Sequence, residues 1–315
     1  ESISTPIIRH AIDNGLNYVD TAYVYSDKKN EKAVAHALRD GYREKVYLAT
    51  KIPTWDIHSP EDMDRLLAEQ LANLETDHID FYLVHSLNKG TWTKVRDLGI
   101  RDFLTKAKAE GKIKYACFSF HDNYDTFIDI IDSYDWDMCQ IQFNYMDIEN
   151  QATQKGLEYA GKKGIPVVIM EGLLGGKLAK APDNVQALYD AFPVKRSPVE
   201  WAFRWLCNHP EVATVLSGVT SMEQCDDNLS IFDRCKVGVM TEAEEELIAR
   251  VREAYKSRTK VGCTGCRYCM PCPNGVDIPR IFAIWNNRFL YNEKLEGNSE
   301  YKRLCDEGHG ADKCV

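Results

Sequence analysis

Four side chains suited to proton transfer occur in this 315-residue chain: Asp20, Tyr25, Lys51 and His85. A phenol has an ordinary pKa of about 10 and donates a proton poorly at neutral pH unless a nearby cation stabilises its phenolate. Lys51 is suited to supply that cation, Asp20 to hold the ammonium in place, and His85 to orient a substrate carbonyl through a hydrogen bond. Taken singly, each residue has an ordinary structural explanation. Their joint occurrence predicts acid–base chemistry, provided that the fold brings them together.

A second chemical group lies near the C-terminal end, where Cys263, Cys266, Cys269 and Cys272 precede Pro273. Four thiolates so close in sequence can enclose an iron–sulfur cluster, and the run resembles the bacterial ferredoxin motif with one residue fewer before its last cysteine. A zinc site more often draws on two separated knuckles and is the less favoured alternative, followed by a metal-free thiol cluster. These four cysteines are therefore the predicted metal ligands, with Cys272 either completing one cluster or, as in two-cluster ferredoxins, serving a second. Cys314 is expected to open a second such run that the chain end interrupts.

The side chains suited to proton transfer are spread over residues 20–85 of the chain, so strands must bring them together. Seven short apolar runs recur, each with a polar residue at its end, and helix-like segments separate them. The runs are Asn17–Thr21, Val46–Lys51, Ile79–His85, Tyr115–Ser119, Met138–Gln142, Pro166–Glu171 and Val212–Ser217. This alternation predicts an α/β fold, the (β/α)8 TIM barrel, in which the C-terminal strand ends meet at one mouth. The polar residues expected to face one another there are Asp20, Lys51, His85, Ser119 and Gln142.

The domain organisation follows from the same pattern. A closed barrel has eight strands, so we expect the first strand to precede Glu1 and the chain to be truncated at its N-terminus. Residues 1–240 are expected to form the barrel. Residues 241–315 are expected to form a small helical, cysteine-rich, ferredoxin-like segment, itself truncated, which begins with the amphipathic helix Thr241–Arg258.

The composition limits the surroundings of the protein. A formal net charge of −9 argues against nucleic acid or an anionic membrane as a partner. No apolar run approaches the ~20 residues needed to span a bilayer, and no signal peptide opens the chain. Six of the eleven cysteines lie at or after residue 263, an asymmetry that favours a metal centre in a reducing compartment over disulfides. We therefore expect a cytoplasmic protein.

From about Arg9 to Asn228 the chain resembles the aldo-keto reductases, most specifically in Gly15–Tyr25, in Thr50–Lys51 and in Leu83–His85. The resemblance implies a catalytic tetrad of Asp20, Tyr25, Lys51 and His85. It also implies NADP or NAD as cofactor, bound without the glycine motif of Rossmann folds. The tail is similar to that of a subfamily with an appended ferredoxin-like segment, which implies a 4Fe-4S cluster.

The same resemblance implies a cofactor site. Two residues match positions that hold the nicotinamide carboxamide, a glycine-rich loop matches the segment that closes over the pyrophosphate, and a third segment matches the adenosine end. Backbone N–H groups and Lys177 suit pyrophosphate binding, although any glycine-rich strand-to-helix loop looks alike. The implied residues are Ser119 and Gln142, then Gly172, Leu173, Leu174, Gly175, Gly176, Lys177 and Leu178, then Ser217, Gly218, Thr220, Gln224 and Asn228.

Several positions depart from the family pattern. Phe120 stands where asparagine is usual, and Met170 stands where an aromatic residue often stacks on the nicotinamide. Gly218 and Gln224 occupy positions where basic residues often hold the 2′-phosphate of NADPH. Losing such charged contacts weakens the case for strict NADPH preference, so NADH use stays open.

The leading functional hypothesis is hydride transfer between a nicotinamide cofactor and a small carbonyl or alcohol substrate, with Tyr25 as the general acid or base. Two alternatives remain. The same barrel is also suited to a redox- or cofactor-sensing binding module with negligible turnover. It is further suited to coupling hydride transfer to an electron-transfer partner through the cluster. The intact tetrad favours an enzyme over a sensor, and the substrate itself is not indicated.

Overall fold

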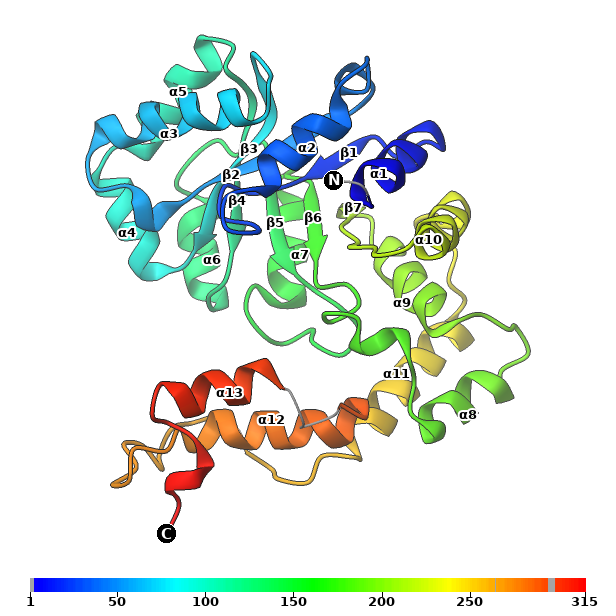
Figure 1. Ribbon diagram of the computed structural model, residues 1–315. Coiled ribbons are helices and arrows are strands. Elements are labelled where there is room, and N and C mark those ends of the chain that lie inside the picture. The colour runs from blue at the N-terminus through cyan, green and yellow to red at the C-terminus, as the bar shows by residue number, and fades with distance from the viewer. Residues whose placement is uncertain (1–2, 264, 294–297) are drawn as a thin grey trace. The chain divides into compact units, whose positions relative to one another are not determined.

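The computed structural model describes residues 3–263, 265–293 and 298–315 (Figure 1). Its sheet has seven parallel strands, each paired with the next in chain order. The strands are β1 (Tyr18–Asp20), β2 (Tyr47–Ile52), β3 (Ile79–Leu87), β4 (Ile113–Phe120), β5 (Met138–Gln142), β6 (Val167–Met170) and β7 (Val212–Val215). The sheet is a curled half-barrel with β1 and β7 at its edges. The seven predicted strands and the α/β class are confirmed, and an eight-stranded closed barrel stays a prediction.

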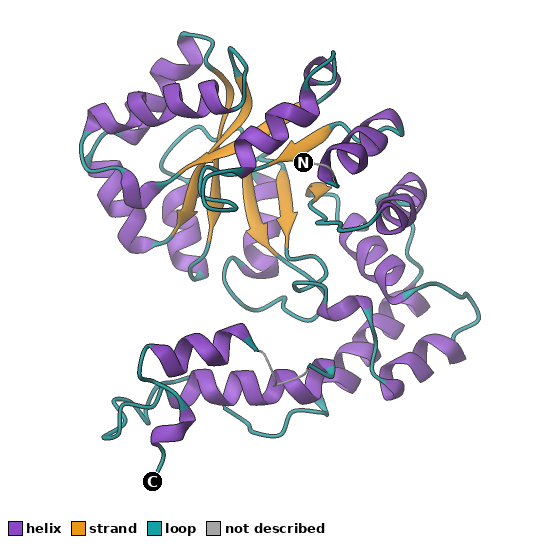
Figure 2. Ribbon diagram, viewed as in Figure 1, coloured by secondary structure: helices purple, strands orange, loops and turns teal. Residues whose placement is uncertain are grey.

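Helices alternate with these strands along the chain, as Figure 2 shows. The helices are α1 (Ser4–Asp13), α2 (Asn30–Leu38), α3 (Pro60–Asn73), α4 (Lys89–Asp97), α5 (Ile100–Ala109), α6 (Tyr124–Ile131), α7 (Thr153–Lys162), α8 (Asp183–Ala191), α9 (Pro198–Cys207), α10 (Met222–Arg234), α11 (Glu242–Lys256), α12 (Ile278–Tyr291) and α13 (Ser299–Asp306). Local signals explain several ends. At the start of α3, for example, the Asp62 carboxylate accepts hydrogen bonds from the backbone N–H groups of His58 and Ser59.

The chain forms two compact units. The first comprises residues 1–172 and 202–239 and contains the whole sheet; the second comprises residues 173–201 and 240–315 and is helical. In the second unit, α11 packs against α8 and α12, and α12 against α13. Residues 173–201 thus belong to the second unit rather than to the one that carries the sheet. The proposed boundary near residue 240 and the ferredoxin-like character of the tail both stay predictions.

The core of the first unit explains where polar groups can lie. A layer of buried apolar side chains, one from each of five successive strands, fills the inside of the curled sheet, with Tyr18, Phe81 and Leu216 packed against it. The layer consists of Ala49, Leu83, Cys117, Met138 and Val168. Because side chains alternate along a strand, residues two positions further on share this inner face, one layer nearer the C-terminal strand ends.

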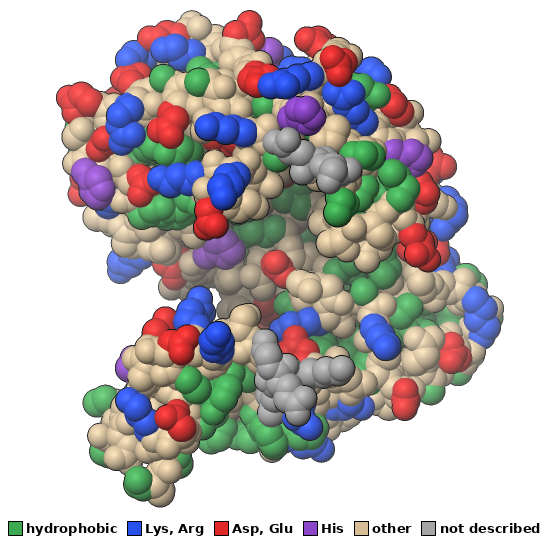
Figure 3. Space-filling view, viewed as in Figure 1, with side chains coloured by type: hydrophobic (Ala, Val, Ile, Leu, Met, Phe, Trp, Pro, Cys, Tyr) green, Lys and Arg blue, Asp and Glu red, His purple; other side chains and the backbone are tan. Residues whose placement is uncertain are grey.

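The surface of the protein carries both acidic and basic side chains. On the face drawn in Figure 3, acidic and basic side chains are interspersed. Of the helices in the described part of the chain, none is both long enough and apolar enough to cross a membrane.

Candidate active site

The layer above the apolar core is polar except for Met170. On each strand from β1 to β6, the residue two positions after the packed core residue lies on the same inner face. These residues are Asp20, Lys51, His85, Ser119, Gln140 and Met170. The sheet thus places three members of the predicted tetrad, together with Ser119, on one inner face at neighbouring strand ends. The fourth, Tyr25, follows on the loop after β1.

Lys51 is the best-fixed group of this layer. Its ammonium Nζ donates to Asp20 Oδ1 at 2.6 Å and to the Thr21 carbonyl at 2.8 Å. The Lys51 side chain is 1% exposed and that of Asp20 12%. Burial raises the pKa of Asp20, and the Lys51 ammonium opposes that rise. In the described part of the chain, the third N–H of the ammonium has no hydrogen-bond partner, so it remains available to a further acceptor.

The phenol of Tyr25 lies beside this ammonium. Lys51 Nζ is 5.2 Å from the centroid of the Tyr25 ring, and Tyr25 is 41% exposed, open to a substrate. Three residues in the left-handed region follow, Ser26–Lys28, with φ of 52°, 53° and 65°. Each such residue costs about 1 kcal/mol or more, the kind of strain that often occurs at functional sites. The loop is held where the Asn30 N–H donates to the Tyr25 carbonyl at 3.3 Å.

His85 completes the constellation. Its ring centroid lies 6.1 Å from that of Tyr25 and 5.1 Å from that of Trp55. Burial, with the Lys51 ammonium and His121 contributing, lowers the pKa of His85 to about 3. The imidazole is therefore neutral at physiological pH and carries a single N–H. Its buried Nδ1 has no partner among the described residues, so the ring is free to exchange hydrogen bonds with a bound molecule.

The structure adds a residue that the sequence analysis missed. Gln140 is 2% exposed, pairs in register with Ser119, and has a buried Oε1 without a partner among the described residues. Gln142, the predicted residue, lies one layer further out and already contacts two side chains, Asp147 at 3.4 Å and Gln151 at 3.1 Å. Both glutamines share the inner face of β5, so alternation alone does not distinguish them. Ser119 Oγ accepts from the Ser86 N–H at 2.8 Å and keeps its own proton to donate.

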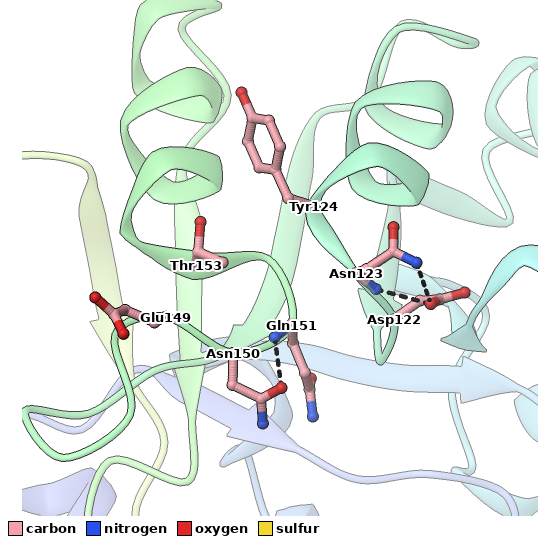
Figure 4. A pocket seen from close by; sticks show the side chains of 7 residues that line it. All are labelled: Asp122, Asn123, Tyr124, Glu149, Asn150, Gln151 and Thr153. Atoms are coloured by element: carbon pink, nitrogen blue, oxygen red, sulfur yellow. Dashed lines mark hydrogen bonds between the residues drawn. The ribbon is translucent and has the colours of Figure 1, made fainter. Parts of the chain in front are cut away.

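An open cavity of about 510 Å³ lies between the loops that follow β4 and β5 (Figure 4). Polar and acidic side chains line it, and none of them belongs to the tetrad. The lining residues are Asp122, Asn123, Tyr124, Glu149, Asn150, Gln151 and Thr153. Gln151, with a left-handed φ of 55°, connects this cavity to the site because its amide donates to Gln142.

The predicted pyrophosphate loop spans the two units. Gly172 belongs to the first unit, where an added Cβ would lie 2.8 Å from Leu206 Cδ1, so close packing there already accounts for a glycine. The rest of the loop belongs to the second unit, where Gly176 has a φ of 87° that favours glycine. There Lys177 Nζ forms an ion pair with Glu293 at 3.2 Å. The predicted phosphate-binding cation thus already has an acidic neighbour.

The predicted adenosine segment is closed by its own hydrogen bonds. Gln224 Oε1 accepts from the Thr220 N–H at 2.9 Å, and Asn228 Nδ2 donates to Ser217 Oγ at 2.9 Å. Gly218 has open space around its Cα. The segment 217–228 contains no Lys or Arg. The fold therefore orders this segment and supplies no cation from within it.

The four predicted metal ligands differ little in exposure. Cys263, Cys266 and Cys269 are exposed and Cys272 is half-buried; Thr264, within the run, lies outside the described residues. In the ranges that the structure describes, no three His, Cys, Asp or Glu side chains are close enough to hold a metal ion. The metal site stays a prediction.

Curated proteins resemble this chain in sequence. The uncharacterized oxidoreductase YrpG of Bacillus subtilis is 26% identical over 289 residues, which cover 74% of this chain and 83% of YrpG. Methylglyoxal reductase YeaE of Escherichia coli is 40% identical over 78 residues. This match covers only 25% of this chain and 27% of YeaE.

Solved structures share the fold. The holo form of an aldo-keto reductase from Bacillus halodurans superposes with a TM-score of 0.66 at 23% identity, covering 79% of this chain and 88% of that one. An aldo/keto reductase from Klebsiella pneumoniae, solved with NADP and acetate, has a TM-score of 0.66 at 22% identity and covers 80% and 85%. The model of the aldo/keto reductase family matches residues 1–238. The chain therefore belongs to the aldo/keto reductase family.

Proposed function

We propose that this protein is an NAD(P)-dependent carbonyl reductase or alcohol dehydrogenase acting on a small-molecule carbonyl or alcohol. The observation that carries the proposal is the Lys51 ammonium, held by Asp20 and Thr21 and lying against the Tyr25 ring. Membership of a reductase family supports it, as does the NADP-bound Klebsiella relative.

In this proposal Tyr25 transfers the proton. In reduction, its hydroxyl protonates the developing alkoxide, and the free N–H of Lys51 stabilises the phenolate left behind. Asp20 keeps the ammonium in place, and the neutral His85 donates a hydrogen bond to the carbonyl oxygen. A bound nicotinamide supplies or accepts the hydride.

The residues present fit such a cofactor. Ser119 has a proton to donate, and the unpartnered Oε1 of Gln140 is suited to accept from a carboxamide. We therefore propose Ser119 and Gln140 as the carboxamide partners, with Gln142 as the alternative. Residues 172–178 are proposed for the pyrophosphate, and Ser217, Gly218, Thr220, Gln224 and Asn228 for the adenosine end.

The test is oxidation of NADH and NADPH with a panel of aldehydes and ketones, for the wild type and for Tyr25→Phe. We expect turnover to fall by ~100-fold or more in the variant while the dissociation constant of the cofactor stays nearly unchanged, because only a positioned proton donor is lost. Tyr47→Phe, at an exposed tyrosine of the same sheet (48% exposed), is the matched control. Full activity of Tyr25→Phe would contradict the mechanism. Cofactor binding without any wild-type turnover would instead favour a sensing module.

We also propose that Cys263, Cys266, Cys269 and Cys272 bind a 4Fe-4S cluster. The donor set supports this, since four thiols lie within ten residues. The lack of a preformed metal-binding group among the described residues does not oppose it, because metal-binding segments commonly order only around their metal. Iron and sulfide analysis of anaerobically prepared protein is the test. Stoichiometric zinc without iron would overturn the proposal and leave the barrel chemistry intact.

A further inference from the structure

A buried polar network lies behind β2, on the side of the strand away from the Lys51 ammonium. Its centre is Glu31, in the first turn of α2 and 1% exposed. Glu31 Oε1 accepts from Thr50 Oγ1 at 2.7 Å and from Gln70 Nε2 at 2.8 Å. Its Oε2 accepts from Asn73 Nδ2 at 3.1 Å. One carboxyl group therefore joins α2, β2 and α3.

The network ends on the backbone of the predicted catalytic lysine. Gln70, fully buried on α3, also donates from Nε2 to the Lys51 carbonyl at 3.0 Å. The amide of Gln70 is itself fixed, because its Oε1 accepts from the Tyr82 hydroxyl at 2.7 Å. Thr50 and Lys51 are thus held by side chains that Glu31 orients.

The neighbouring residue reaches the other half of the site. Asn30 Oδ1 accepts from Thr21 Oγ1 at 2.7 Å, and the Asn30 N–H donates to the Tyr25 carbonyl. Thr21 is the residue whose carbonyl accepts from Lys51 Nζ. The first turn of α2 therefore contacts the segments that carry Tyr25 and Lys51 alike.

Stability alone does not account for a carboxyl group at this place. Among the described residues, the hydrogen-bond partners of Glu31 are all neutral donors and it forms no ion pair. Burial raises the pKa of Glu31, and the hydrogen bonds from Gln70, Thr50 and Asn73 oppose that rise. A buried carboxyl held in this way contributes little net stability compared with an apolar side chain of similar volume. What the carboxyl group does provide is geometry, because it fixes three donor side chains around the end of β2.

We propose that Glu31 is a positioning residue for Lys51. Through Thr50 and Gln70 it holds the Thr50–Lys51 peptide, and so keeps the ammonium between Asp20, Thr21 and Tyr25. It acts through Lys51 and touches neither substrate nor cofactor. This inference rests on the proposed function, because the role of Lys51 is taken from it.

Two substitutions at one position test the idea. Glu31→Gln keeps an oxygen that accepts from Thr50 and Gln70, and Asn73 can turn its amide to accept from the new NH₂ group. Glu31→Ala leaves these donors without an acceptor. We expect kcat to stay within about threefold in Glu31→Gln and to fall by ~10-fold or more in Glu31→Ala. This loss is smaller than the ~100-fold or more expected for removing an acid–base group outright, because the ammonium is displaced and not removed. The cofactor dissociation constant should change little in either variant. Glu75→Gln, which removes an exposed carboxylate at the end of α3, is the control.

The pH profile separates positioning from general damage. A displaced ammonium stabilises the Tyr25 phenolate less, so the alkaline limb of kcat should move to higher pH in Glu31→Ala and not in Glu31→Gln. In the described part of the chain, Lys51 and His85 are the titratable side chains that lie against this phenol ring. If Glu31→Ala fails to fold, Thr50→Val removes a single donor from the network at nearly constant volume. It should lower kcat several-fold, and wild-type kcat in Thr50→Val would then overturn the proposal.

Hydrogen–deuterium exchange of the peptide covering Tyr47–Ile52 measures how firmly β2 is held and does not require an active enzyme. We expect faster exchange there in Glu31→Ala than in Glu31→Gln. A folded Glu31→Ala protein with wild-type kcat and unchanged exchange would overturn the proposal, as would equal losses in both variants with an unmoved alkaline limb. A wild type that turns over no carbonyl would refute the proposed function instead, and exchange alone would then decide whether Glu31 positions β2.

Discussion

Replacing Lys51 by Met should separate the structural from the catalytic effect of one buried charge. The Lys51 and Asp20 side chains are 1% and 12% exposed and their charged atoms are 2.6 Å apart. At an effective dielectric of about 20, charges at this distance of 2.6 Å attract by roughly 6 kcal/mol, and desolvation offsets much of that attraction. Removing one partner of a buried pair costs about 3–5 kcal/mol. Since burial already raises the pKa of Asp20, the abandoned carboxyl should take up a proton, which places the expected loss near 3 kcal/mol.

Thermal and urea unfolding measure this loss. At about 2–4 °C per kcal/mol for a unit of this size, the melting temperature of Lys51→Met should fall by roughly 6–12 °C. Turnover should fall by ~100-fold or more, because the phenolate loses its cation. The double variant Asp20→Asn/Lys51→Met removes both charges. It should regain most of the lost stability and none of the activity.

The control is the same substitution at an exposed site. Lys45→Met removes a lysine whose side chain is 51% exposed and which pairs with Asp13, so its stability should change by no more than about 1 kcal/mol. Two results would refute the reasoning. One is a Lys51→Met protein that keeps half of its turnover; the other is a double variant less stable than Lys51→Met itself.

Three further expectations follow from the site and its surroundings. Because the segment 217–228 contains no Lys or Arg, the ratio of NADPH to NADH dissociation constants should show modest or reversed preference; a ~1000-fold preference for NADPH, worth about 4 kcal/mol, would contradict this. Because burial and Lys51 lower the pKa of His85 to about 3, the pH profile of kcat/KM should show no limb from this imidazole between pH 5 and 7; a limb near pH 6.5 that disappears in His85→Gln would count against it. Burial would raise the pKa of Asp80, but bonds from the Leu48 N–H, Lys114 and Arg43 together hold that pKa below its usual 3.8. A carboxylate whose pKa is lower in the folded than in the unfolded state stabilises the folded protein at pH values above its unfolded-state pKa. This stabilisation is lost as the pH falls through the folded-state pKa. The stability gap between wild type and Asp80→Asn, measured by urea unfolding, should therefore be wide at pH 7 and shrink below about pH 4, and a gap independent of pH would contradict this assignment.

Much of the fold followed from short-range sequence signals. Apolar runs that end on polar residues identified all seven strands, because a strand buried on both faces needs consecutive apolar residues. Glycine after a helix is another short-range signal. Gly15, Gly111 and Gly164 follow α1, α5 and α7 and have left-handed φ values of 102°, 71° and 71°, which few other residues adopt without strain. Asparagine caps are a further local signal, since the side chains of Asn88 and Asn123 accept hydrogen bonds at the start of α4 and α6.

The proximity of the predicted tetrad residues was also readable from sequence, since three of them stand at strand ends and parallel strand ends meet. The choice between Gln140 and Gln142 was not. Period-two alternation puts both on the inner face, and their height in the layer depends on the register of β5 against β4, which sets Ser119 opposite Gln140. The network around Glu31 depends likewise on tertiary packing, because it joins side chains from α2, β2 and α3 that are distant in sequence. Sequence spacing determines which side chains share a face or an end of an element; only the packing of elements against one another decides which buried polar atoms find partners and which are left open to a ligand.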